Sequence, residues 1–201
     1  MAYYEPYTPL FHEIFTKVNN AKDKAKKVAV LRKYDNPNFR AFLMVAFNPD
    51  IEWLLPEGDV PYIENDAPEG TEHSLLSVES RTIHNYVKRK VNNPIAGTPE
   101  WVFGNAALND MKRETMFIQL LEGLHASEAK VLCLAKDRIL HRKYKGLNAN
   151  TVQQAFGWDE NFIDAKLVAQ RRAQQRPRDP MRPHGDLGRT PADIADSQRF
   201  G

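Results

Sequence analysis

Side chains that could bind a metal or transfer protons are present in this 201-residue sequence, but they are scattered. His125 and Glu128 stand three residues apart and could share one face of a helix, as an acid–base or metal-binding pair would require. Two carboxylate pairs between Asp50 and Asp59 could bind Mg²⁺ if the fold brought them together. A proline-rich loop does not hold several oxygen ligands in fixed geometry, so we expect no metal site.

The sequence contains no motif for nucleophilic catalysis or nucleotide binding either. Cys133 lies in the apolar run VLCLA without an activating base beside it, which is typical of a core residue. The ten glycines are dispersed, and none precedes Lys-Ser or Lys-Thr as in a phosphate-binding loop. We therefore predict that the chain is not an enzyme and uses no catalytic residues, metal or cofactor.

The single thiol and the apolar pattern also bear on the compartment. One cysteine cannot form an intramolecular disulfide, which fits a reducing environment. The N-terminal segment has no basic region followed by an apolar stretch, and no apolar run approaches the roughly 18 to 20 residues that span a bilayer. We expect a protein with no membrane partner.

Charge is segregated along the chain, although the net charge is only +2. Residues 41–80 carry nine carboxylates and no Lys or Arg, whereas residues 81–145 carry twelve basic and six acidic side chains. Such a chain could attract phosphate with its basic parts and a basic partner with its acidic insert. The simpler alternative is that solvated loops happen to be acidic.

Two basic clusters are candidates for contact with nucleic acid. One ends a predicted helix, and the other forms an elbow after a later helix, with a tyrosine available to stack on a base. The candidate nucleic-acid-binding residues are Lys88, Arg89, Lys90, Arg142, Lys143, Tyr144 and Lys145. The first cluster also suits the negative end of a helix dipole. A pI of 8.6, without a zinc-finger or RNA-binding motif, argues against a dedicated nucleic-acid-binding domain.

The acidic insert and the C-terminal residues are candidates for a protein interface. Tryptophans in loops and a linear tail with a few apolar side chains commonly serve partner docking. The candidate partner-binding residues are Asp50, Glu52, Trp53, Glu57, Asp59, Ile194 and Phe200.

Hydrophobic periodicity and capping residues predict mostly helix. The predicted helices begin near Pro9, Asn20, Pro37, Ser74, Asn109, Ser127 and Asn150, and a further one follows Asp159. The helix that begins at Ser74 is predicted to continue to Lys90.

Two segments between these helices are predicted to be irregular. The acidic loop, residues 48–73, is broken by prolines and should be anchored by Trp53 and Tyr62, with a short strand at residues 52–55 as an alternative. The second loop, residues 91–105, should be anchored by Trp101 and Phe103.

The predicted fold class is mainly α. We expect a compact bundle of about seven helices with an irregular acidic insert and a disordered C-terminal tail. Residues 1–175 should form a single helical domain. Residues 176–201 are rich in Pro, Arg and Gly and should form a flexible tail, because they cannot bury enough apolar surface to fold.

The order of several motifs carries a resemblance. FNPDIEWLLPEG (47–58) and NDAPEGTEHSLL (65–76) are followed by FIQLLEGLHASEAKVL, KDR, KYKGL and AFGWDENF. In this order they are similar to an uncharacterised family of conserved proteins of T4-like tailed bacteriophages, of the marine cyanophage type. The resemblance spans about residues 9–162 and implies a virus-encoded protein in the cytoplasm of its bacterial host. It implies no catalytic residues.

Three functions are compatible with these observations. The leading hypothesis is a non-enzymatic accessory or adaptor protein that binds phage or host replication or transcription machinery. Direct nucleic-acid binding through the basic clusters is the alternative, and a virion or assembly component is the third.

Overall fold

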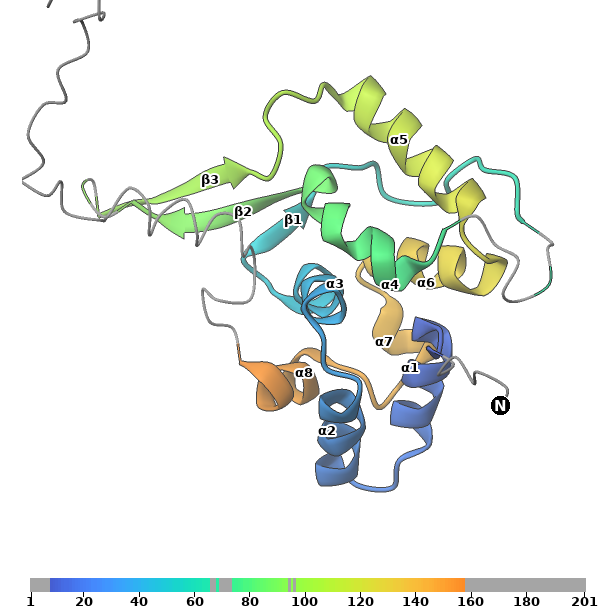
Figure 1. Cartoon of the computed structure of the whole chain (residues 1–201). Coiled ribbons are helices and arrows are strands. Elements are labelled where there is room, and N and C mark those ends of the chain that lie inside the picture. Colours follow the sequence, from blue (N-terminus) through green and yellow to red (C-terminus); the bar gives the residue numbers. More distant parts are fainter. Residues whose placement is uncertain (1–7, 66–67, 69–73, 94, 96, 158–201) are drawn as a thin grey trace, which may run out of the picture. The chain divides into compact units, whose positions relative to one another are not determined.

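The computed structural model describes residues 8–65, 68, 74–93, 95 and 97–157. Over these residues the chain is mainly helical and carries one small sheet (Figure 1), which confirms the mainly α prediction. The α-helices are α1 (Phe11–Asn20), α2 (Lys24–Lys33), α3 (Pro37–Phe47), α4 (Leu76–Glu79), α5 (Asp110–Gly123), α6 (Ala126–Lys136), α7 (Leu140–Lys143) and α8 (Ala149–Phe156). The 3-10 helix η1 (Ser80–Tyr86) follows α4, and the strands are β1 (Ile51–Trp53), β2 (Val87–Asn92) and β3 (Pro99–Phe103).

An aromatic cluster between α1 and α3 lies at the centre of the core. Phe11 and Phe15 of α1 meet Phe39 and Phe42 of α3, and all four rings are buried. The centroids of Phe11 and Phe39 are 5.1 Å apart in an edge-on arrangement, and Phe15 stacks on Phe42 at 5.9 Å. The rings share one face of each helix because they stand four and three residues apart. Each such pair contributes about 0.5–1.5 kcal/mol beyond its burial.

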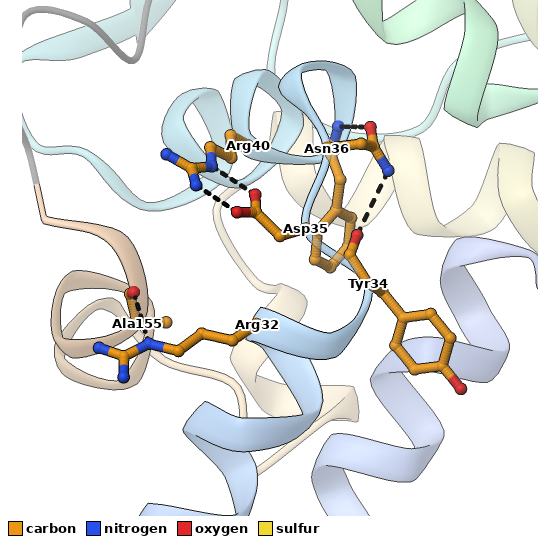
Figure 2. A network of polar contacts seen from close by, with 7 residues as sticks. Arg32, Tyr34, Asp35, Asn36, Arg40 and Ala155 are labelled. Atoms are coloured by element: carbon orange, nitrogen blue, oxygen red, sulfur yellow. Dashed lines mark hydrogen bonds and ion pairs between the residues drawn. The ribbon is translucent and has the colours of Figure 1, made fainter.

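The turn from α2 to α3 is fixed by side chains close in sequence (Figure 2). The Asn36 side-chain oxygen accepts a hydrogen bond from the Phe39 amide at 2.9 Å, and Arg40 forms an ion pair with Asp35. The predicted start of this helix near Pro37 is therefore confirmed, because the Asn36 cap satisfies an amide that has no partner within the helix.

Helix α8 is tied to α2 by an arginine (Figure 2). The Arg32 guanidinium donates from Nε to the carbonyl oxygen of Ala155 at 3.0 Å. The cap of α8 is Asn148, whose side chain accepts from the Thr151 amide at 3.0 Å. The helix that was predicted to begin near Asn150 therefore starts slightly earlier, because Asn148 is its cap.

Helix α2 also begins later than its sequence pattern indicated. It was predicted to begin near Asn20, but Asp23 accepts a hydrogen bond from the Lys26 amide at 2.7 Å and the helix starts at Lys24. This hydrogen bond to the Lys26 amide lowers the pKa of the Asp23 carboxyl below its ordinary value. A carboxylate at this position also suits the positive end of the helix dipole.

Glu128 of α6 links the N-termini of two other helices. Its side chain is fully buried, and its two carboxylate oxygens accept hydrogen bonds from the Phe11 amide at 3.0 Å and the Leu76 amide at 2.8 Å. These amides belong to the first residues of α1 and α4, where the helix itself offers no acceptor. One charged side chain therefore positions three helices.

The acidic loop packs against the helices as predicted for its aromatic residues. Trp53 is partly buried, and its ring meets Phe117 of α5 edge-on with centroids 6.3 Å apart. Tyr62 is also partly buried, and burial raises the pKa of its hydroxyl to about 12. The alternative prediction of a short strand at residues 52–55 is confirmed by β1, which begins one residue earlier than predicted.

A buried lysine holds the middle of the acidic loop. The Lys136 ammonium donates to the carbonyl oxygens of Pro56 at 2.8 Å and Gly58 at 3.0 Å. Glu64 forms an ion pair with Lys130 of α6 at 3.1 Å. Part of the segregated charge is thus paired within the chain, between the acidic loop and α6.

The predicted helix from Ser74 to Lys90 is wrong beyond its first turns. Helix α4 ends at Glu79, η1 follows, and the chain then enters β2 at Val87. The predicted loop at residues 91–105 contains β3, which pairs with β2 in a sheet of order β1-β2-β3. The apolar spacing around η1 resembles a helix, but pairing with β1, which lies far away in sequence, determines the structure from Val87 onward.

Two further observations concern the limits of the fold. None of the helices in the described residues is long and apolar enough to cross a membrane. The predicted last helix after Asp159 and the tail at residues 176–201 lie outside the described residues. The predicted domain boundaries therefore stay predictions.

Candidate nucleic-acid interface

Strands β2 and β3 form a β-hairpin, residues 87–103, which we call the hairpin arm (Figure 1). Its turn is closed by the Gly97 amide, which donates to the Asn93 carbonyl oxygen at 2.9 Å, and by the Asn93 amide, which donates to the Thr98 carbonyl oxygen at 3.0 Å. Gly97 has a φ of 65°, which favours glycine. In Figure 1 the hairpin arm extends beyond β1 and away from α7 and α8.

The register of the strands determines which side chains lie on each of the two faces of the arm. Lys88 lies opposite Phe103, and Lys90 lies opposite Trp101. Residues directly opposite in an antiparallel pair point to the same side of the sheet. The two lysines and the two aromatic side chains therefore share one face, which we call the aromatic–lysine face. Glu52 of β1 joins it, because it lies opposite Lys88.

The aromatic–lysine face is turned away from the core. The other face carries Ile51 and Val87, which are buried. Trp101 is 39% exposed and Phe103 is 48% exposed. Large aromatic side chains that are exposed together on one face commonly mark a binding site.

Lys88 is held over the aromatic surface. Its ammonium lies 2.8 Å from the Glu52 carboxylate and 4.6 Å from the centroid of the Trp101 ring. A cation at this distance is attracted by the negative face of the ring. The charge is thus positioned at the edge of the aromatic surface.

The base of the arm is fixed by close packing. A Cβ atom at Gly104 would lie 1.9 Å from the carbonyl oxygen of His84, so only glycine fits there. The Gly104 amide donates to the Val87 carbonyl oxygen at 3.0 Å. The buried Arg113 of α5 donates to the carbonyl oxygens of Asn85 at 3.1 Å and Leu108 at 2.9 Å. These two carbonyl groups lie on either side of the arm in sequence.

The first predicted basic cluster therefore lies on a strand and not at the end of a helix. Lys88, Arg89 and Lys90 belong to β2, the central strand, so the explanation by a helix dipole does not apply. The aromatic residues beside them were predicted to be buried anchors, and this prediction is wrong for Trp101 and Phe103. The sequence does contain a signal for this hairpin: Asn93 and Gly97 lie in a turn between residues 87–92 and the run WVF at residues 101–103.

The second basic cluster supplies cations but no stacking ring. Three exposed residues of α7 belong to it, His141, Arg142 and Lys143, and the exposed Lys145 follows the helix. Tyr144 is only 4% exposed, and its ring meets Phe15 edge-on with centroids 5.5 Å apart. The prediction that Tyr144 is available to stack on a base is therefore wrong. Burial also raises the pKa of its hydroxyl.

Lysines of α2 meet the end of this elbow in a polar cavity of about 270 Å³. The cavity is lined by Lys24, Lys27, Gly146, Asn148, Asn150 and Thr151. A Cβ atom at Gly146 would lie 2.8 Å from the Lys27 ammonium, so the lysine covers this glycine closely. The cavity is a second cationic region, formed by elements other than the hairpin arm.

The candidate partner-binding residues are spread over several environments. Asp50, Glu57 and Asp59 are exposed, whereas Glu52 is paired with Lys88 and Trp53 packs against the core. Ile194 and Phe200 lie outside the described residues. Of the acidic candidates, Asp50, Glu57 and Asp59 are therefore the exposed carboxylates that a partner could contact.

His125 and Glu128 have separate structural roles. The Nδ1 atom of His125 accepts a hydrogen bond from the Ser127 amide at 3.2 Å, which makes His125, not Ser127, the cap of α6. The Ser127 hydroxyl lies 2.7 Å from that atom and 2.9 Å from Nδ1 of His12. In the described part of the chain, no three His, Cys, Asp or Glu side chains gather as metal ligands.

Comparison with known proteins places the chain in a family. A family model described as a family of unknown function matches residues 14–142, from α1 to α7. This range includes the hairpin arm and the whole of the acidic loop. No curated protein and no solved structure matches the chain.

Proposed function

The chain belongs to the family of unknown function DUF6433, and we propose that it binds nucleic acid directly through the hairpin arm. The observation that carries the proposal is the aromatic–lysine face, where Lys88 and Lys90 lie opposite Phe103 and Trp101. Cations that contact phosphates, together with exposed rings, are the usual elements of a nucleic-acid-binding surface.

Charge supports this assignment. The sequence from Val87 to Phe103 carries three cationic side chains and one carboxylate, Glu100. Glu52 shares the aromatic–lysine face and forms an ion pair with Lys88, so the arm together with this residue carries three cationic and two acidic side chains. The acidic loop, residues 48–73, carries eight carboxylates and no Lys or Arg. A polyanion is therefore attracted to the arm more than to the loop.

The resemblance to proteins of T4-like bacteriophages supports a setting for this function. We propose that the protein acts in the cytoplasm of an infected bacterium, where phage and host nucleic acids are both present. Replication and transcription intermediates are then the natural ligands.

A binding measurement with charge variants tests the proposal. We expect the full chain to bind a labelled oligonucleotide in fluorescence anisotropy at about 50 mM salt, with an affinity that falls steeply as salt rises. Lys90→Glu on the arm should weaken binding. Lys112→Glu, a charge reversal at an exposed lysine of α5, is the matched control and should leave affinity nearly unchanged.

The elbow is tested in the same assay. A combined reversal of Arg142, Lys143 and Lys145 measures whether the second cluster extends the binding surface. Absence of binding to any nucleic acid at about 50 mM salt would contradict the proposed function.

A protein adaptor role is the second candidate, and one observation favours it. Ile63, in the acidic loop beside Glu64, is 80% exposed. An exposed isoleucine in the same loop as the exposed carboxylates Glu57 and Asp59 is the combination that a basic partner with an apolar contact would bind. Ile63→Ser combined with reversal of these two acids should then abolish recovery of a stoichiometric partner from infected cells.

A further inference from the structure

We propose that the hairpin arm selects single-stranded nucleic acid, with bases stacked on Trp101 and Phe103 and backbone phosphates beside Lys88 and Lys90. This inference rests on the proposed function and specifies the substrate class of the same site. It follows from the direction and spacing of four side chains on one face.

The two rings are placed to take separate bases. Trp101 and Phe103 stand two residues apart in β3 and therefore point to the same side. Their Cα atoms are roughly 6.7 Å apart along an extended strand. Each ring can then present its own surface to one base of an extended single strand. Stacking of this kind accepts every base, because each has a π-face.

A lysine accompanies each ring. The register places Lys90 opposite Trp101 and Lys88 opposite Phe103, and the Lys88 ammonium reaches diagonally to 4.6 Å from the Trp101 centroid, where it pairs with Glu52. Directly opposite side chains have Cβ atoms about 4.5–5.5 Å apart. A base on Trp101 would therefore bring its phosphate within reach of the Lys90 ammonium, whereas a phosphate near Lys88 would share that ammonium with Glu52.

A duplex cannot use this face fully. In a double helix the faces of the bases are covered by their neighbours, and proteins contact phosphates and base edges. A duplex would engage Lys88 and Lys90 but leave Trp101 and Phe103 in water. Single strands gain both contacts, so they should bind more tightly.

A second copy of the chain is a poorer occupant of this face. Pairing of two arms would bring the cations of both β2 strands together, and Glu52 is already paired with Lys88. Repulsion between like charges opposes such a contact. Charge complementarity therefore favours a polyanion.

The test compares a labelled oligo(dT) of about 12 nucleotides with a blunt duplex of the same length, using the full chain and fluorescence anisotropy at about 50 mM salt. We expect the single strand to bind about tenfold more tightly. Trp101→Ala should weaken binding to oligo(dT) by about fivefold to hundredfold, the range for loss of one stacked base, and should leave duplex binding unchanged. Trp101→Phe should restore most of the affinity.

Val102→Ala is the matched control. Val102 lies between the two rings in sequence and is 40% exposed, but it points to the opposite face. This variant should bind oligo(dT) like the wild-type chain. Circular dichroism of each variant confirms that the fold is kept.

Three results would overturn the inference, and they separate it from the proposed function. Equal binding of single strand and duplex, unaffected by Trp101→Ala but weakened by Lys90→Glu, leaves the proposed function standing and refutes the preference for single strands. Absence of binding to both ligands refutes both. A dimer in sedimentation velocity that Trp101→Ala dissociates shows that a second copy covers the face.

Discussion

The guanidinium of Arg113 donates a hydrogen bond from Nε to the carbonyl oxygen of Asn85 over 3.1 Å. Asn85 lies just before the hairpin arm, and Leu108, whose carbonyl accepts a second hydrogen bond at 2.9 Å, lies just after it. One side chain that is 2% exposed therefore joins the two ends of the arm to α5.

Replacing this arginine should loosen the arm and destabilise the fold. Arg113→Met leaves two part-buried carbonyl groups without their donor, at about 1–3 kcal/mol each. We expect the free energy of unfolding in urea to fall by about 3 kcal/mol. Asp110→Asn is the control, because the carboxylate that pairs with Arg113 at 2.5 Å is largely exposed. It should cost at most about 1 kcal/mol. An Arg113→Met variant as stable as wild type would contradict this account.

Adding a methyl group at Gly104 should displace the base of the arm. The new Cβ would lie 1.9 Å from a backbone oxygen of His84, which cannot move without shifting η1. Gly104→Ala should lower the thermal midpoint and speed hydrogen exchange at the amides of β2. Gly97→Ala is the comparison: it has open space at Cβ, and its positive φ alone should cost about 1 kcal/mol. Equal midpoints for the two variants would show that the close approach is unimportant.

Neutralising Glu128 should separate three helices. Glu128→Gln keeps the shape of the side chain but turns one acceptor into a donor, so either the Phe11 or the Leu76 amide loses its partner. Hydrogen bonds to charged groups contribute about 1.5–3 kcal/mol, so we expect a loss of about 3 kcal/mol in chemical unfolding. Glu122→Gln is the matched control: Glu122 accepts a hydrogen bond from the Ile63 amide at 3.3 Å in exposed surroundings, so its change should be below about 1 kcal/mol. A neutral effect at Glu128 would refute the bridging role.

Alkaline pH should ionise the half-buried thiol of Cys133 and lower the stability of the fold. Burial raises its pKa from 9.0 to about 11. In the unfolded chain the thiol ionises near pH 9.0, whereas in the folded chain it stays neutral until about pH 11. The neutral thiol therefore contributes its full stabilisation below pH 9.0, and this stabilisation is lost as the pH rises to about 11. Urea midpoints of wild type and Cys133→Ala should therefore converge over that interval. Reaction with a thiol reagent at neutral pH should also be slower than for the unfolded chain.

Local signals in the sequence predicted several helix boundaries correctly. Asn36 caps α3, which begins at Pro37 as predicted, and Asn109, where a helix was predicted to begin, caps α5. Each of these boundaries depends on a side chain and an amide within three residues, so a single sequence carries the information.

Features that depend on distant contacts were not predictable in this way. Tyr144 stands among basic residues that suggest exposure, yet Phe15 buries it from the other end of the chain. The exposed state of Trp101 depends on the pairing of β2 with β1. The local pattern at such positions fits two outcomes, and tertiary packing selects between them.

The carboxylate of Glu128 also sets an order of events during synthesis. Glu128 is synthesised 117 residues after Phe11, whose amide donates a hydrogen bond to its carboxylate. At about 5–20 residues per second, a ribosome needs roughly 6 to 23 s to cover that distance. The first helix of the nascent chain must therefore wait for its anchor, and chaperones have that interval in which to bind its phenylalanines.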